Sequence, residues 1–163
     1  MSQVEDIIRR ELEVAVEPAR AWSALVEPDL LARWYGRPSV PLEAGIELEF
    51  VFQPDGGEQR ARARVLEVRA GRSVTYRWVP GTAAQWGDLL DRDAPFDELP
   101  TTLVELRVEP TDDPRSSLIR VLEAGFAALP RQVAATMAAG NTGGWEYCFG
   151  RLEDVLGASV TAR

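Results

Sequence analysis

Short stretches of alternating apolar and polar residues run through most of the chain, and such alternation is typical of strands with one buried face. It predicts strands over residues 8–16, 46–52, 59–68, 73–79, 102–109 and 117–123. In the third of these strands the alternation shifts at Val65–Leu66, which predicts a bulge. The connections within this set resemble hairpins, as at the turn over residues 54–57, so we expect an antiparallel sheet.

Two short helices are predicted directly after the first strand. Pro18 suits the first turn of a helix, where its missing N–H is not needed, and residues 21–26 supply an apolar side. Pro28 ends this helix and begins the next, which covers residues 29–35 and closes at Gly36. Two short helices that meet at a proline form a compact corner.

An apolar stripe with helical spacing predicts a helix near the C-terminus. Its residues are Trp145, Phe149, Leu152 and Leu156. We expect Thr142 to cap the helix at its N-terminus and Gly157 to form a left-handed cap at its C-terminus. Residues 129–139 predict another helix just before it. The glycines between the two stretches permit either two separate helices or one kinked helix.

Length and charge exclude several classes of protein. With 163 residues and 45% hydrophobic content, the chain fits a single domain over residues 1–163. The net charge of −8 argues against nucleic-acid binding, which needs clustered cations. No apolar run is long enough to span a membrane and the first residues are too polar for a signal peptide, so we expect a cytoplasmic protein.

The residue types that are missing restrict the chemistry further. The chain contains no His, and all 18 basic residues are Arg. This composition excludes His-based catalytic triads, His metal ligands, Schiff-base lysines and lysine-dependent phosphate loops. Any catalysis would depend on carboxylates, Tyr, Cys148, Arg or water, so an enzyme is less expected than a binding protein. We expect no cofactor and no metal.

Three sequence motifs, in order, resemble those of a known family. Residues 21–36 (AWSALVEPDLLARWYG) are similar to the pattern V-W-x-A-L-T-D-P-E-L-L-x-x-W-W-G. Residues 65–68 and 74–78 are similar to V-x-E-V and L-x-Y-x-W, and residues 144–156 to G-W-x-x-x-L-x-x-L-x-x-x-L. These patterns are found in the START-like or SRPBCC superfamily, in the branch of the activator of heat-shock-protein ATPase homologues (AHSA-like).

The resemblance implies an α+β helix-grip fold, in which a curved antiparallel sheet wraps around a long C-terminal helix. It also implies a cavity between the sheet and that helix, and no shared set of catalytic residues. The acidic stretch over residues 80–100 lies outside the resemblance and is expected as an inserted loop. A loop of this length is often functional. Its Trp86 and Phe96 leave open a role as a lid over the cavity.

Eight aromatic residues are the candidate ligand-binding site. Seven fall on faces that should point between sheet and helix, and Trp86 is placed with them near the opening. The eight residues are Trp34, Phe50, Phe52, Tyr76, Trp78, Trp86, Trp145 and Phe149. One interpretation is ordinary core, because aromatic rings routinely fill such interiors. The other is a pocket for a flat apolar molecule, which the small residues Gly143, Gly144, Ala61 and Ala63 beside large rings favour.

Two further candidates are expected to be structural. Glu47 and Glu49 could act as an acid–base pair, but they are expected to form cross-strand ion pairs with Arg60, Arg62, Arg64 and Arg77. Cys148 has no neighbouring cation to lower its pKa, so we expect a buried structural thiol.

We therefore expect non-enzymatic binding of a small hydrophobic or aromatic molecule, as in a carrier, a sequestering protein or a sensor. One alternative is a co-chaperone-like module with a chaperone or other protein as its partner. Another is a cyclase or hydrolase that uses carboxylates and water. Neither nucleic acid nor membrane is an expected partner, and the sequence is compatible with a monomer or a homodimer.

Overall fold

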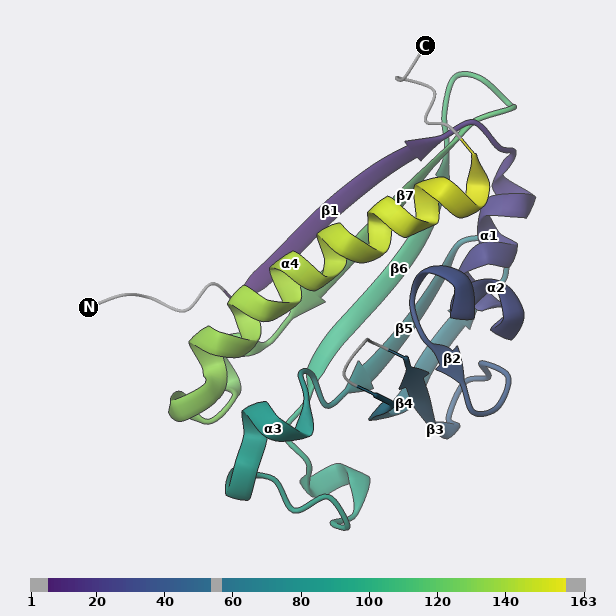
Figure 1. The fold of residues 1–163 in the computed structure, drawn as a ribbon. Coiled ribbons are helices and arrows are strands. Elements are labelled where there is room, and N and C mark those ends of the chain that lie inside the picture. The colour runs from purple at the N-terminus through teal and green to yellow at the C-terminus, as the bar shows by residue number, and fades with distance from the viewer. Residues whose placement is uncertain (1–5, 54–56, 158–163) are drawn as a thin grey trace.

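A computed structural model describes residues 6–53 and 57–157 and contains a seven-stranded sheet, helices and short 3-10 turns (Figure 1). The strands are β1 (Ile7–Val14), β2 (Arg37–Pro38), β3 (Glu47–Phe52), β4 (Gln59–Arg69), β5 (Ser73–Trp78), β6 (Thr102–Pro110) and β7 (Ser117–Ala124). The helices are α1 (Pro18–Val26), α2 (Pro28–Trp34), α3 (Ala83–Trp86) and α4 (Arg131–Leu156). The 3-10 turns are η1 (Gly87–Leu89), η2 (Phe96–Glu98) and η3 (Phe126–Ala128).

The sheet has the order β1-β7-β6-β5-β4-β3-β2, and every neighbouring pair is antiparallel. The predicted antiparallel sheet is therefore confirmed. The bulge is confirmed as well, because the β4–β5 register shifts between Val65 and Glu67. The two-residue strand β2 was not predicted. Residues 54–56 of the predicted turn lie outside the described residues.

The long helix α4 lies across one face of the sheet, and α1 and α2 form the predicted corner beside it (Figure 1). Pro18 and Pro28 each begin a helix, as expected. The apolar face of β1 is interrupted by Arg10, whose Nη2 lies 2.9 Å from Glu146 Oε1 on α4. This ion pair ties the edge strand to the helix. None of the described helices is both long and apolar enough to cross a membrane.

Residues 131–156 form one continuous helix, which settles the question that the glycines left open. The expected N-cap at Thr142 is wrong, because Thr142 lies within the helix and its hydroxyl donates to the Ala138 carbonyl at 2.8 Å. Gly157 does have a positive φ of 93°, but its ψ of −179° is not that of a left-handed cap. Burial of one continuous stripe stabilises α4 across its glycines. The stripe comprises Val133, Ala134, Met137, Ala138, Trp145, Phe149, Leu152 and Leu156.

The glycines of α4 lie on its exposed side, so the expectation that Gly143 and Gly144 leave room beside the interior rings is wrong. A Cβ at either position would meet nothing within 4 Å. Gly36 differs, because it is buried and a Cβ there would lie 2.8 Å from the Phe52 ring. Close approach of the backbone to an aromatic ring therefore requires glycine at position 36.

These two environments predict opposite effects of adding one methyl group. Gly143→Ala should raise the free energy of unfolding by about 0.5–1 kcal/mol, because alanine favours the helix and the space is open. Gly36→Ala should lower it by about 1–3 kcal/mol, because the new methyl group forces the Phe52 ring to move. Urea denaturation of both variants measures the difference, and effects of the same sign would contradict this description.

Candidate functional site

Seven of the eight predicted aromatic residues gather in one place, between the sheet and α4. Together with Tyr35 they form a network of ring contacts with centroid separations of 5.1–6.4 Å. We call this group the aromatic cluster. Its members are Trp34, Tyr35, Phe50, Phe52, Tyr76, Trp78, Trp145 and Phe149. All are buried except Tyr35 and Phe52, which are half-buried and mark where the cluster reaches the surface.

Tyr35 lies at the centre of the cluster and was not predicted as a site residue. Its ring stacks on Trp145 at 5.1 Å with an interplanar angle of 14°. It also contacts four other rings, those of Trp34, Phe50, Phe52 and Trp78. The Tyr35 hydroxyl lies 2.7 Å from the Tyr76 hydroxyl. The Tyr35 ring therefore fills the centre of the space that the other rings surround.

The end of α2 explains why both Trp34 and Tyr35 point inward. Successive residues of a helix point about 100° apart, so helical spacing alone would turn Tyr35 away from Trp34. The helix ends at Trp34, and Tyr35 leaves helical geometry with φ −127° and ψ −106°. Trp34 is fixed by its indole N–H, which donates to the Ala24 carbonyl at 2.8 Å. The chain can thus bury two consecutive rings.

The most unusual group beside the cluster is Glu123 on β7, which is 0% exposed. The indole N–H groups of Trp78 and Trp145 each donate to it at 2.8 Å. Thr102 donates its hydroxyl at 2.5 Å, and the Asn141 amide donates at 3.0 Å to both oxygens. A carboxylate has about four lone-pair positions, so these donors occupy its accepting capacity. Glu123 therefore positions the two indoles and is not a free base.

Glu123 was missed although the sequence carried a signal. It lies two residues after Val121 and four after Ile119, and all three share the inward face of β7. The strict alternation of the strand therefore placed a carboxylate inside. The potential partners on α4, β5 and β6 could not be identified in advance, because they depend on how the helix lies over the sheet.

The two tyrosine hydroxyls are held in their neutral form. Burial raises the pKa of Tyr35 and Tyr76 well above the usual value, and the charge of Glu123 acts in the same direction. They share a single hydrogen bond, so one O–H is left without an acceptor among the described groups. This arrangement offers a hydrogen-bond donor inside an apolar ring cage.

Trp86 does not join the aromatic cluster. It lies in the insertion, which we define as residues 80–100, where its indole N–H donates to the Pro80 carbonyl at 2.6 Å. Arg62 on β4 donates to the carbonyls of Arg92 and Ala94 at 3.2 and 2.6 Å. Arg64 binds Asp97 at 2.5 Å, and its guanidinium lies over the Phe96 ring at 4.8 Å. These contacts place residues 92–97 of the insertion on the outward side of β4, whereas α3, at its start, packs against α4.

Two open hollows lie beside the insertion, between it and β3–β4. Their volumes are about 230 and 530 Å³. None of the eight cluster rings lines either one. In this conformation the rings of the protein itself, with Tyr35 at their centre, pack the space between sheet and helix.

Two of the predicted cross-strand ion pairs are present on the outward face, whereas Arg62 and Arg77 form no ion pair among the described residues. Arg64 lies 2.6 Å from Glu47, and Arg60 lies 3.4 Å from Glu49. Pairs this exposed are screened by solvent and add little to stability. Across residues 6–53 and 57–157 no group of three or more acidic or thiol side chains could hold a metal ion.

Cys148 is a half-buried thiol, whereas the sequence predicted a buried one. Burial raises its pKa to about 11, although Arg151, one turn further along α4, acts in the opposite direction. Sequence inspection overlooked this cation, but burial has the larger effect.

Replacing Glu123 with Gln should destabilise the fold. The amide keeps the size of the side chain but presents N–H groups to donors, so at least one buried indole or amide loses its acceptor. We expect the free energy of unfolding to fall by about 2–4 kcal/mol. Glu105→Gln, on the outward face, should change it by less than about 0.5 kcal/mol. Urea denaturation checks both values, and similar effects at the two positions would contradict the assigned role.

Alkylation of Cys148 by iodoacetamide should be slow at pH 8. Only the thiolate reacts, and a pKa of about 11 leaves a thiolate fraction near 10⁻³. A free cysteine with a pKa of about 8.5 would react roughly two hundredfold faster. Mass spectrometry of the folded and urea-unfolded protein measures both rates, and equal rates would show that the thiol is not shielded.

The fold is shared with many solved structures. Protein MLL2253 from Mesorhizobium loti is 21% identical with a TM-score of 0.69, and the match covers 92% of this chain and 96% of that one. CalU16 from Micromonospora echinospora is also 21% identical with a TM-score of 0.61, covering 92% and 74%. DynU16, from the dynemicin biosynthetic locus, is 21% identical with a TM-score of 0.67 and a coverage of 93% of this chain. This chain spans only 47% of DynU16.

The helix-grip fold that the sequence predicted is thereby confirmed. No curated protein matches the sequence significantly. The family model described as Activator of Hsp90 ATPase homolog 1-like protein matches residues 15–157, which is most of the chain. The chain therefore belongs to the family of Activator of Hsp90 ATPase homolog 1-like proteins.

Proposed function

We propose that this protein binds a small, neutral aromatic molecule within the aromatic cluster and does not transform it. The molecule takes the place that the Tyr35 ring occupies here. The observation that carries the proposal is the stacking of this half-buried ring on Trp145, inside a cage of rings that are buried except for Phe52. Neither the sheet nor α4 supplies Tyr35. It follows the short helix α2, so a change in the backbone after Trp34 can withdraw it.

The surface areas that are buried favour replacement of the Tyr35 ring by a ligand. Aromatic side chains bury roughly 150–250 Å² each, at about 25 cal/mol per Å². A two-ring ligand would bury at least as much surface as Tyr35 does. Because part of Tyr35 is already exposed, its withdrawal loses less burial than the ligand gains.

Polar groups in the cluster define the class of ligand. The Tyr76 hydroxyl, which Tyr35 now contacts at 2.7 Å, would donate to a hydroxyl or carbonyl oxygen of the ligand. The buried Glu123 carboxylate would repel a second anion in this region of low dielectric constant. A neutral planar phenol or aromatic ketone fits both conditions.

The same groups support binding without turnover. The lone pairs of Glu123 are occupied by donors, and the two tyrosines stay protonated because burial raises their pKa. Neither can serve as a base at neutral pH. DynU16, a structural neighbour, comes from a locus for dynemicin biosynthesis, which is in keeping with a helper that holds a small molecule.

A second candidate function is a protein-interaction module of the Hsp90-activator type. The family match favours it, and so does the packing of the interior by the protein's own rings. In this case the aromatic cluster would be core, and the outer surface would meet the chaperone.

Titration with 2-naphthol, followed by tryptophan fluorescence, separates the two. The wild-type protein should show a saturable change, because Trp145 and Trp78 would contact the ligand. Tyr35→Ala should bind about tenfold more tightly, since the ligand no longer displaces a ring. Tyr76→Phe should weaken binding, because the hydroxyl donor is lost while the ring remains.

Tyr147→Ala is the matched control. Tyr147 lies on α4 but is 67% exposed, so its removal should leave the affinity unchanged. A wild-type protein without any saturable response would reject the proposal and favour the interaction module. If the Tyr35→Ala variant bound 2-naphthol and the wild-type protein did not, the binding would reflect only the cavity that the substitution creates.

A further inference from the structure

The smaller hollow beside the insertion has two fixed walls. One is β4, and the other is the insertion, which Arg62 and Arg64 hold in place through the contacts described above. At the start of the insertion, Thr82 and Gln85 form a reciprocal capping box. The hollow is thus formed by packed segments.

The size of the hollow suits one substituted ring. Its volume of about 230 Å³ is below the roughly 300–1,000 Å³ of pockets for drug-sized ligands. An apolar cavity of about 150 Å³ is large enough to bind benzene. The remaining space would hold one small polar substituent. Trp86, Leu90, Val79 and Leu99 supply apolar surface to the lining.

The charges at the rim favour an anionic substituent. The rim carries Arg60, Arg62 and Arg92 against two carboxylates, those of Glu49 and Asp93. Arg60 is already paired, with Glu58 at 2.7 Å and with Glu49 at 3.4 Å. Within the described part of the chain, Arg62 and Arg92 have no carboxylate within ion-pair distance. Among the remaining lining charges, two arginines, Arg62 and Arg92, stand against one carboxylate, Asp93, so an excess of one positive charge remains on a protein whose net charge is −8.

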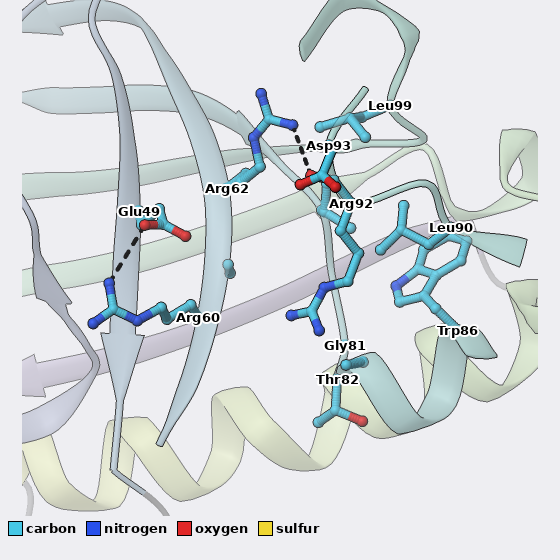
Figure 2. A pocket seen from close by; sticks show the side chains of 13 residues that line it. Glu49, Arg60, Arg62, Gly81, Thr82, Trp86, Leu90, Arg92, Asp93 and Leu99 are labelled. Carbon is cyan, nitrogen blue, oxygen red and sulfur yellow. Dashed lines mark hydrogen bonds and ion pairs between the residues drawn. The ribbon is translucent and has the colours of Figure 1, made fainter. Parts of the chain in front are cut away.

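Figure 2 shows where the side chains of Arg92 and Arg62 lie. The Arg92 side chain extends from the insertion toward β4, with Trp86 and Leu90 beside it. Arg62 extends from β4 toward the segment of the insertion that carries Arg92 and Asp93. A guanidinium group binds a carboxylate through two parallel N–H donors, so Arg92 matches the polar end of an aryl carboxylate whose ring rests on the apolar lining.

We propose that this hollow is a second binding site, which takes a small aromatic monoanion of the aryl carboxylate class. It differs from the aromatic cluster in position, residues and charge preference. The cluster lies next to a buried anion and suits neutral molecules, whereas the hollow selects a negative charge. Binding at one site does not require binding at the other.

Benzoate and its neutral analogue benzamide test the proposal in the ¹H–¹⁵N spectrum, where each tryptophan gives its own indole N–H signal. Benzoate should shift the Trp86 signal saturably, and benzamide should bind about tenfold more weakly. Added salt should weaken benzoate binding, because the rim charges are exposed to solvent.

Arg92→Gln should lower the affinity for benzoate about tenfold, because the free guanidinium is lost. The matched control is Arg115→Gln, at an exposed arginine in the β6–β7 turn, which should leave the affinity unchanged. Unperturbed signals of Trp78 and Trp145 will show that each variant is folded. The proposal is overturned if benzoate shifts those two signals instead of Trp86, if benzamide binds equally well, or if Arg92→Gln binds like the wild type.

Discussion

One buried carboxylate fixes how the two layers of this protein meet. Glu123 accepts hydrogen bonds from β5, β6 and α4 while it lies on β7 itself. Burying a charge is costly unless its hydrogen bonds are complete, so the arrangement is stable only when every donor is in place. Rotation or sliding of α4 over the sheet would remove two donors at once. The geometry of the aromatic cluster therefore depends on a polar contact, although its contents are apolar.

The two faces of the sheet carry opposite chemistry. On the inner face the rings surround a single anion whose hydrogen bonds are satisfied, and the accessible polar groups are neutral hydroxyls. On the outer face, Arg62 and Arg64 of β4 hold the insertion, whose Arg92 has no ionic partner among the described residues. Alternation along β4 alone produces this division, because Ala61 and Ala63 face the interior while Arg60, Arg62 and Arg64 face outward.

The sequence was sufficient for the fold because the relevant signals are local. Alternation located the strands, prolines located the starts of α1 and α2, and the register shift at Val65 located the bulge. The candidate site was harder to predict than the fold, because it depends on where helices and strands end and on how they pack. Tyr35 points inward only because α2 stops one residue earlier, since continued helical spacing would have turned it to the other side. The insertion contacts arginines that had been assigned to cross-strand pairs alone. No local pattern reports such long-range partners.

The pairing of the first strand with the last has a consequence for biogenesis. β1 pairs with β7, and the cluster is complete only when α4 covers it. The exposed side of α4 carries glycines, so this helix has little intrinsic tendency to form before it docks. During translation the earlier strands therefore leave the ribosome without their cover, with Trp78 and Phe50 accessible to water. Contacts between such distant segments slow folding, so the nascent chain has to remain soluble until α4 has been made.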